Sequence, residues 1–182
     1  MAHQPNAILV VDGYNIVGAC PDLSRTRDRH SLEEARHRLT EAMISYSALQ
    51  NYFTWLVFDA YGTRGPAAVD RQTDNLHVHY TSLGQTADTY IERVCADFRY
   101  DVRRFEQRLI VATSDRAQRL MVVGYGAEWI SAQRLLVDMG LQQQTVRQRK
   151  DSRQRSSGRL SSALDPVAHQ RLSQMRYGLS GK

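Results

Sequence analysis

The sequence predicts an α/β fold in which helices cover a mainly parallel central sheet. Short apolar segments of strand length alternate with longer segments of helical periodicity, as in parallel sheets built with crossover helices. Most strand segments are continuously apolar, as expected for strands that are buried on both faces. With 182 residues, 42% hydrophobic and 24% charged, the chain has an ordinary size and composition for one globular domain.

The first half of the chain contains the first helix and three of the expected strands. AILVV, residues 7–11, is a short apolar strand that stops at Asp12. The next segment, 31–50, is expected to be helical because Ser31 and Glu34 form a capping box. FTWLVFDA (53–60) is rich in strand-forming residues, YGTRGPAAVDRQTDN (61–75) is a polar loop, and LHVHYT (76–81) alternates like an edge or half-exposed strand. One helical stripe is expected to face the core: Leu32, Ala35, Leu39, Ala42, Tyr46 and Leu49.

The second half continues the alternation of helices and strands. A helix is expected over 85–100, with Thr86 as its cap. Its buried face follows helical spacing: Ile91, Val94, Cys95 and Phe98. The remaining expected elements of the domain are a strand at 108–115, a helix at 116–126, a strand at 128–131 and a helix at 132–140. The predicted order is therefore βαββαβαβα.

The C-terminal region differs in composition from the rest. Residues 145–163 are basic and serine-rich, so a linker is expected there, and 164–178 predict a short helix with Pro166 at its first position. Residues 147–182 contain nine Lys or Arg and two acidic residues, whereas 1–146 have a net charge of −2. This asymmetry favours phosphate contacts with a polyanion, and the alternative is a solvated end that binds nothing. The candidate RNA-binding cations are Arg147, Arg149, Lys150, Arg153 and Arg155.

Several classes of protein are not favoured. The two cysteines, Cys20 and Cys95, have neither CxxC spacing nor metal-ligand neighbours, which argues against a disulfide framework or a zinc site. No apolar run approaches the roughly 20 residues that span a bilayer, so we expect no membrane segment. The first residues do not resemble a secretory signal, and we expect a cytoplasmic protein.

Acidic residues recur where strands end. Asp12, Asp59 and Asp115 each follow an apolar strand, and the carboxyl ends of parallel strands form the crevice where ligands bind. Asp88 lies in the first turn of its helix, and Glu92 lies one turn further along the same side. Crowded carboxylates repel unless a cation lies between them. Because the ligands are oxygen only, Mg²⁺ or Mn²⁺ is the expected cofactor, and its chemistry suits phosphodiester hydrolysis.

Simpler interpretations remain open for these residues. Each aspartate could instead cap a helix or form a turn. Asn15 could fix the turn or orient Asp12, and Ser114 could cap a helix or contact phosphate. His77 and His79 form an HxH pair that could bind a metal, but their alternating strand favours a solvated face.

Five segments together resemble a known family. They are DGYN at 12–15, VFDA at 57–60, TAD at 86–88, TSD at 113–115 and ISAQRLL at 130–136. The set is similar to the YacP-like group of small bacterial and plastid endoribonucleases, in the NYN-domain branch of the PIN-like nucleases. The resemblance runs from about residue 7 to 140. It implies a PIN-like three-layer α/β/α sandwich, a nuclease domain over 7–144, and a basic extension over 145–182.

The resemblance also implies an activity and a site. Members of this group are associated with metal-dependent cleavage of messenger RNA on translating ribosomes. By position, Asp12, Asp88 and Asp115 would be the catalytic, metal-binding acids, with Asn15 and Glu92 in support. The cellular location would be the cytoplasm, or the plastid stroma in a photosynthetic eukaryote. The alternatives are a non-catalytic RNA- or ribosome-binding module and, less favoured because DGYN lacks the DxDxT order, a small-molecule phosphohydrolase.

Overall fold

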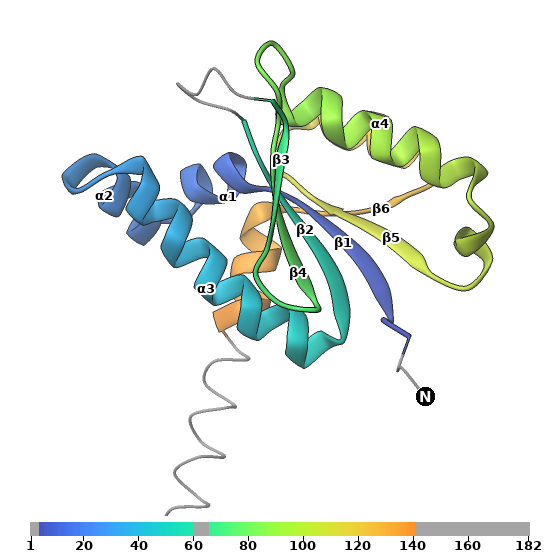
Figure 1. Cartoon of the computed structure of the whole chain (residues 1–182), viewed down its shortest axis with the longest axis horizontal. Helices are drawn as coiled ribbons and strands as arrows, with labels where there is room; N and C mark the ends of the chain where they lie inside the picture. The colour runs from blue at the N-terminus through green and yellow to red at the C-terminus, as the bar shows by residue number, and fades with distance from the viewer. Residues whose placement is uncertain (1–3, 60–65, 141–182) are drawn as a thin grey trace, which may run out of the picture. The chain divides into compact units, whose positions relative to one another are not determined.

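The protein contains a six-stranded sheet between two layers of helices (Figure 1). The computed structural model describes residues 4–59 and 66–140. The strand order is β3-β4-β2-β1-β5-β6, and every neighbouring pair is parallel except β3 and β4, which are antiparallel. The predicted α/β class with a mainly parallel sheet is confirmed.

The elements have the following bounds. The strands are β1 (Ala7–Asp12), β2 (Tyr52–Phe58), β3 (Ala68–Arg71), β4 (Leu76–Tyr80), β5 (Arg108–Ala112) and β6 (Glu128–Ile130). The helices are α1 (Gly13–Ala19), α2 (Pro21–Arg29), α3 (Leu32–Gln50), α4 (Ala87–Tyr100), the 3₁₀ helix η1 (Val102–Phe105) and α5 (Arg116–Gly124). Residues 132–140 are also helical.

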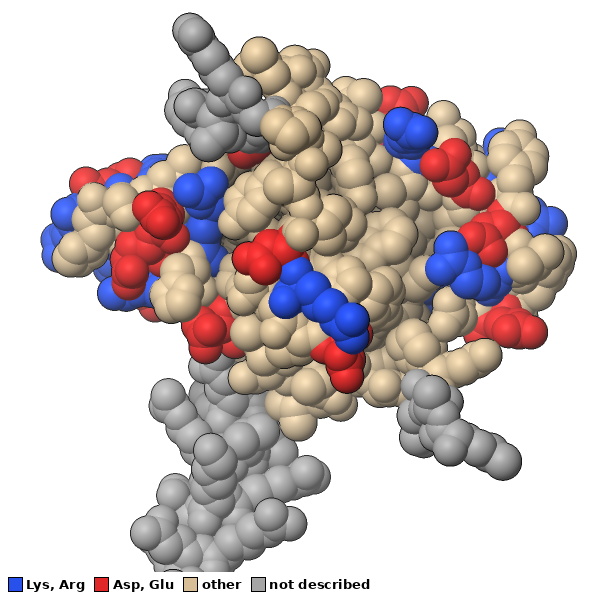
Figure 2. All heavy atoms as spheres, viewed as in Figure 1, with Lys and Arg blue, Asp and Glu red and all other residues tan. Residues whose placement is uncertain are grey.

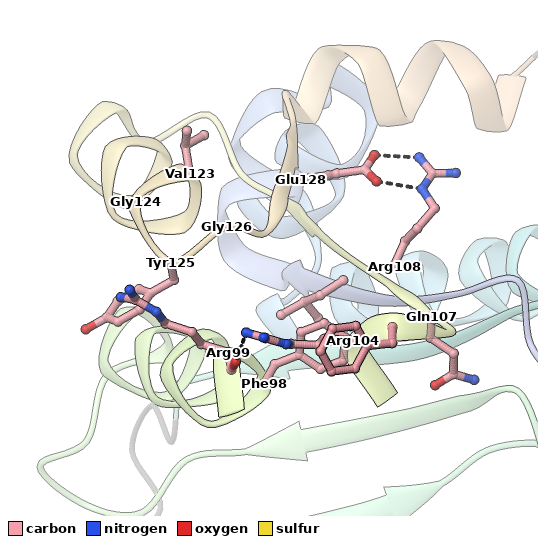
Figure 3. A pocket seen from close by; sticks show the side chains of 12 residues that line it. Phe98, Arg99, Arg104, Gln107, Arg108, Val123, Gly124, Tyr125, Gly126 and Glu128 are labelled. Carbon is pink, nitrogen blue, oxygen red and sulfur yellow. Dashed lines mark hydrogen bonds and ion pairs between the residues drawn. The ribbon is translucent and has the colours of Figure 1, made fainter. Parts of the chain in front are cut away.

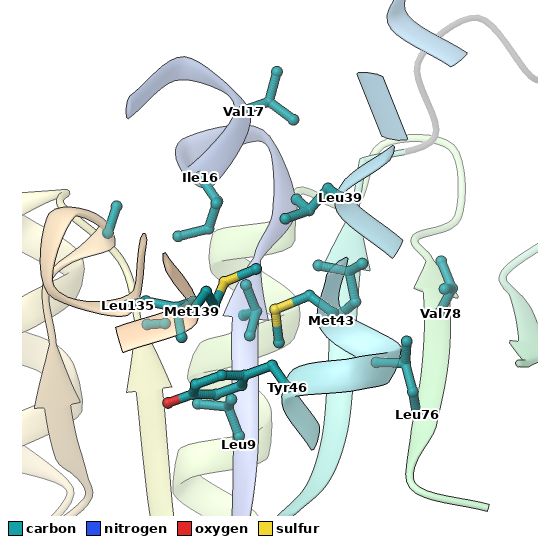
Figure 4. Close-up of a cluster of buried hydrophobic side chains, with 14 of the residues drawn as sticks. Leu9, Ile16, Val17, Leu39, Met43, Tyr46, Leu76, Val78, Leu135 and Met139 are labelled. Carbon is teal, nitrogen blue, oxygen red and sulfur yellow. The ribbon is translucent and has the colours of Figure 1, made fainter. Parts of the chain in front are cut away.

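Each face of the sheet has its own hydrophobic core. On one face, α1, α3 and the helical residues 132–140 pack against the strands, and Figure 4 shows Ile16, Leu39, Met43 and Leu135 meeting above Leu9 of β1. On the other face, α4 and α5 cover side chains of β1, β2 and β5. Because successive residues of a strand point to opposite faces, β1 contributes to both cores and is buried along its whole length.

Three regions differ from the sequence prediction. The expected polar loop 61–75 contains the strand β3. All four residues of β3 are exposed, so the sequence has no alternating apolar pattern at this place. The segment 76–81 is half-exposed, as expected. It is not the edge strand of the sheet, because β3 pairs with β4 on its outer side. The helices α1 and α2 and the 3₁₀ helix η1 were not predicted, because they are short and, for α2, strongly polar.

The stripe expected on 31–50 is mostly correct. Ala35, Leu39 and Tyr46 are buried in the core, but Leu49 is half exposed and Met43 takes an interior position instead. The helix ends at Gln50, and its C-cap is the left-handed residue Asn51.

The predicted basic linker, the C-terminal helix and the five candidate cations at 147–155 lie outside the described residues. On the face that Figure 2 displays, acidic and basic side chains of the described residues alternate in small groups instead of forming a band of one sign. Among the described residues, no helix has the length and apolar character needed to cross a membrane.

Candidate functional site

The predicted acidic edge is built first by the end of β1. In the sheet register Asp12 pairs with Val57, two residues before Asp59, and Val11 pairs with Ala112, three residues before Asp115. The carboxyl ends of the three central strands are therefore level. Asp12 is 8% exposed and accepts a hydrogen bond of 3.0 Å from the backbone N–H of Asn15, which makes it the N-cap of α1.

Gly13 explains why α1 can begin directly after the strand. A Cβ atom at this position would lie 2.2 Å from an atom of the Phe58 ring, the last residue of β2. The first turn of α1 therefore packs against β2 at a distance that only glycine allows. This close approach brings Asp12 to the end of β2.

Asp115 has the same relation to the end of β5. It caps α5 by accepting a hydrogen bond of 2.8 Å from the backbone N–H of Gln118. The capping interpretation is thus correct for both Asp12 and Asp115. Capping uses only part of a carboxylate, because its two oxygens offer about four lone-pair sites. A cap and an ion ligand are compatible roles.

Asp88 and Asp59 connect the first turn of α4 to this edge. Asp88 accepts a hydrogen bond of 2.6 Å from Nε2 of Gln118, and Asp59 accepts one from the backbone N–H of Ala87, the first residue of α4. Gln118 is 4% exposed, and its Oε1 is buried without a hydrogen-bond partner among the described residues. Sequence reasoning missed Gln118, although its place three residues after the cap Asp115 follows a capping-box spacing.

Asn15 and Ser114 join the loops around the acids. The backbone N–H of Ser114 donates to Oδ1 of Asn15 at 2.7 Å, while the Ser114 hydroxyl donates to Gln133 at 2.8 Å and accepts from the backbone N–H of Ala132 at 3.1 Å. Ser114 thereby satisfies the first backbone N–H of the helical residues 132–140, whose N-cap is the expected Ser131, which accepts from the backbone N–H of Arg134 at 3.1 Å. The side chain of Asn15 holds the loop between β5 and α5 by accepting the hydrogen bond from Ser114. In the described hydrogen bonds, Asn15 contacts the Asp12 carboxylate through its backbone N–H and not through its side chain.

The pKa values of Asp12 and Asp88 reflect both burial and the neighbouring acids. The pKa of Asp12 is raised to about 6, chiefly by burial, with smaller contributions from the negative charges of Asp88 and Asp59 and against the lowering effect of the Asn15 N–H. Burial also raises the pKa of Asp88, with contributions from the charges of Asp115 and Asp59. Asp12 and Asp88 are therefore destabilised in their charged forms by neighbouring carboxylates, which is a repulsion that a cation would relieve.

The grouping is looser than a cage of direct ligands. Within residues 4–59 and 66–140, no three His, Cys, Asp or Glu side chains come close enough to hold one metal ion together. Glu92 is exposed and accepts a hydrogen bond of 3.4 Å from the hydroxyl of Tyr125, the C-cap of α5. Its supporting role stays a prediction.

A basic and aromatic group beside Asp59 was not predicted. Arg36 of α3 donates to the Tyr14 hydroxyl at 3.4 Å, and its guanidinium carbon lies 5.7 Å from the centre of the Tyr80 ring. Burial raises the pKa of Tyr14, the charge of Arg36 opposes this, and Asp59 adds to it. Arg36 has no carboxylate partner among the ion pairs of the described chain, so its positive charge is available next to the acids.

The histidine pair is not a simple solvated face. Nδ1 of His79 lies 2.7 Å from the Tyr90 hydroxyl, and burial lowers the pKa of His79 to about 4. His77 packs edge-on against Phe53. The expectation of a solvated face is therefore wrong for His79, because α4 covers this part of β4.

Comparison with known proteins agrees with the fold and identifies the family. The model of the YacP-like NYN domain family matches residues 9–177. The uncharacterized protein YacP of Bacillus subtilis (strain 168) is 31% identical over 157 residues, covering 85% of this chain and 88% of that protein. A crystal structure of Rae1 (YacP) from Bacillus subtilis superimposes with a TM-score of 0.68 at 28% identity, covering 94% of this chain and 95% of the other. A mutant form of Rae1 gives a TM-score of 0.69 at 26% identity, covering 93% and 99%.

Proposed function

Because the chain belongs to the YacP-like NYN domain family, a nuclease-like family, we propose that it is a Mg²⁺- or Mn²⁺-dependent endoribonuclease. Its substrate would be messenger RNA on translating ribosomes. The observation that carries this proposal is the group of aspartates at the carboxyl edge of the sheet, in which the pKa of Asp12 is raised to about 6 partly by the charges of Asp88 and Asp59.

The donors fit a hard divalent ion in their chemistry. They are carboxylate oxygens, and Mg²⁺ commonly binds through one or two carboxylates while keeping several waters. A set of three direct ligands is therefore not required. One or two of Asp12, Asp88 and Asp115 would bind the ion directly and the rest would contact it through its waters, with Asp59 in support. When bound, such an ion supplies Lewis-acid stabilisation of charge and lowers the pKa of a coordinated water.

The chain's own residues would orient the site and the substrate. Gln118 holds Asp88 through Nε2, and Asn15 holds the loop that carries Ser114 and Asp115. Arg36 is suited to bind an RNA phosphate, because a guanidinium forms paired hydrogen bonds with phosphate oxygens. The Arg36 side chain contacts the hydroxyl of Tyr14 and the ring of Tyr80. Water attack with departure of the 3′ oxygen would leave 5′-phosphate and 3′-hydroxyl ends.

The ribosomal part of the proposal rests on the family resemblance and on the charge of the chain. Residues 147–182, with nine Lys or Arg and two acidic residues, account for the positive net charge of the chain, which suits an anchor on ribosomal or messenger RNA. An enzyme that acts on translating ribosomes would work in the cytoplasm, or in the stroma of a plastid.

A second candidate is an RNA- or ribosome-binding module that does not cleave. The specific observation in its favour is that the described residues contain no group of three potential metal ligands. Such a protein would bind RNA equally well with and without EDTA, and would produce no new RNA ends in Mg²⁺.

The deciding experiment is cleavage of translated and untranslated messenger RNA, followed by end mapping. We expect the wild type to cut in Mg²⁺ and not in EDTA, and Asp12→Asn, Asp88→Asn and Asp115→Asn to lose at least about 100-fold in rate, as when one charge-stabilising group is removed from an active site. Asp97→Asn is the control, because Asp97 is an exposed residue of the same helix as Asp88. Equal rates in all variants would reject a catalytic role for the acids.

A further inference from the structure

A pocket of about 480 Å³ lies at the opposite end of the sheet from the acids. It is formed by the end of α4, by η1, by the start of β5, by the end of α5 and by the start of β6 (Figure 3). The strand β5 starts at the pocket with Arg108 and ends near the acids at Ala112, a rise of about 13 Å at roughly 3.3 Å per residue. The pocket is therefore separate from the group of four aspartates, although Tyr125, which lines it, donates a hydrogen bond to Glu92.

The pocket has an excess of positive charge. Three arginines and one carboxylate line it: Arg99, Arg104, Arg108 and Glu128. Glu128 is paired with Arg108 through two hydrogen bonds of 2.6 and 2.5 Å. Arg99 and Arg104 have no carboxylate partner among the ion pairs of the described residues. The excess of about two positive charges favours an anionic ligand.

One of the two unpaired arginines, Arg104, is held in place without being neutralised. Arg104 donates a hydrogen bond of 2.7 Å to the backbone carbonyl of Arg99, and its guanidinium lies 4.6 Å from the centre of the Phe105 ring. Figure 3 shows the bond from Arg104 to Arg99 inside the pocket. Both contacts leave further N–H groups of Arg104 for a ligand, because a guanidinium has five donors.

Aromatic rings alternate with these cations. Phe98, Phe105 and Tyr125 line the pocket, and Phe105 is 78% exposed. A large ring left in water next to unpaired guanidinium groups is the combination that binds single-stranded nucleic acid, with bases stacked on the rings and phosphates on the arginines. An acidic peptide would use the charges but not the rings.

We infer that this pocket is a non-catalytic subsite for single-stranded RNA. One base stacks on Phe105 or Tyr125, and its phosphate is bound by Arg99 and Arg104. The choice of RNA rests on the proposed function, whereas the chemistry of the ligand, an aromatic ring with a phosphate, rests on the pocket alone. The subsite would hold a part of the RNA that is distant from the bond to be cut.

The test is the affinity of the full-length protein for a labelled single-stranded RNA of about 12 nucleotides, a length that one such groove covers, measured by fluorescence anisotropy in EDTA. We expect Arg104→Ala and Phe105→Ala each to weaken binding about tenfold, and Arg104→Ala to reduce the salt slope by about one. Phe105→Trp should retain the affinity because it keeps a stacking surface. Arg103→Ala is the matched control, since Arg103 belongs to the same 3₁₀ helix but pairs with Asp101 at 2.6 Å and does not line this pocket.

Unchanged RNA affinity in both Arg104→Ala and Phe105→Ala would overturn the inference, as would an equal loss in Phe105→Trp. Its failure is distinguishable from failure of the proposed function. If RNA binding depends on Arg104 and Phe105 but no variant or wild type cleaves, the subsite stands and the nuclease proposal falls. If the aspartates are needed for cleavage but Arg104 and Phe105 are not needed for binding, the nuclease proposal stands and the subsite falls.

Discussion

Replacing Asp12 by asparagine should stabilise the metal-free protein at alkaline pH. Burial and the neighbouring acids raise the pKa of Asp12 from 3.8 to about 6. The folded state then binds more protons than the unfolded state between these values, so stability falls as the pH rises from 4 to 6 and stays reduced above 6. A rise of about two pKa units corresponds to roughly 3 kcal/mol at 1.36 kcal/mol per unit. Asparagine removes this charge and caps a helix as well as aspartate does.

Urea unfolding at pH 4 and pH 8, in EDTA, measures this effect. We expect Asp12→Asn and wild type to be nearly equal at pH 4, and the variant to be more stable by about 2 to 3 kcal/mol at pH 8, which corresponds to a shift of about 4 to 12 °C in melting temperature. Asp97→Asn, an exposed change on α4, should alter neither value by more than about 0.5 kcal/mol. A variant that is no more stable than wild type at pH 8 would refute the raised pKa of Asp12, which comes first from burial and then from the charges of Asp88 and Asp59.

Two further predictions concern particular contacts, and a third concerns the charge of the C-terminal region. Gly13→Ala should cost about 1 to 3 kcal/mol in the free energy of unfolding, because its Cβ would overlap the Phe58 ring, whereas Gly18→Ala in the same helix meets nothing within 4 Å and should be neutral or stabilising. Arg36→Ala should raise KM for RNA roughly tenfold with little change in melting temperature, and an unchanged KM would exclude it from phosphate binding. Removing the chain after Gly140 should flatten the salt dependence of RNA affinity, since nine Lys or Arg are lost. An unchanged salt slope would show that the tail is not the anchor.

The sequence was sufficient where one short segment determines the structure. The buried strands before Asp12, Asp59 and Asp115 were recognised from continuous apolar runs, and parallel pairing then required their ends to meet at one edge. β3 was not predicted, because its four residues are exposed and pair only with β4. Their sequence therefore has no alternation of apolar and polar residues that would indicate a strand.

The parts of the site that were missed depend on packing between distant segments. Arg36 reaches Tyr14 and Tyr80 only because α3 lies across one face of the sheet. Gln118 meets Asp88 because α4 and α5 begin side by side on the other face. Neither contact has a local signature, although the spacing of Gln118 from its cap was visible.

The most direct test of the central claim is the binding of Mn²⁺ to the full-length protein, measured by electron paramagnetic resonance at neutral pH. The acidic edge predicts a saturable Mn²⁺ site in the wild type that Mg²⁺ displaces and that Asp12→Asn and Asp88→Asn weaken by at least about tenfold, while Asp97→Asn leaves it intact. Equal Mn²⁺ binding in all four proteins would contradict the claim that these carboxylates gather around a divalent ion.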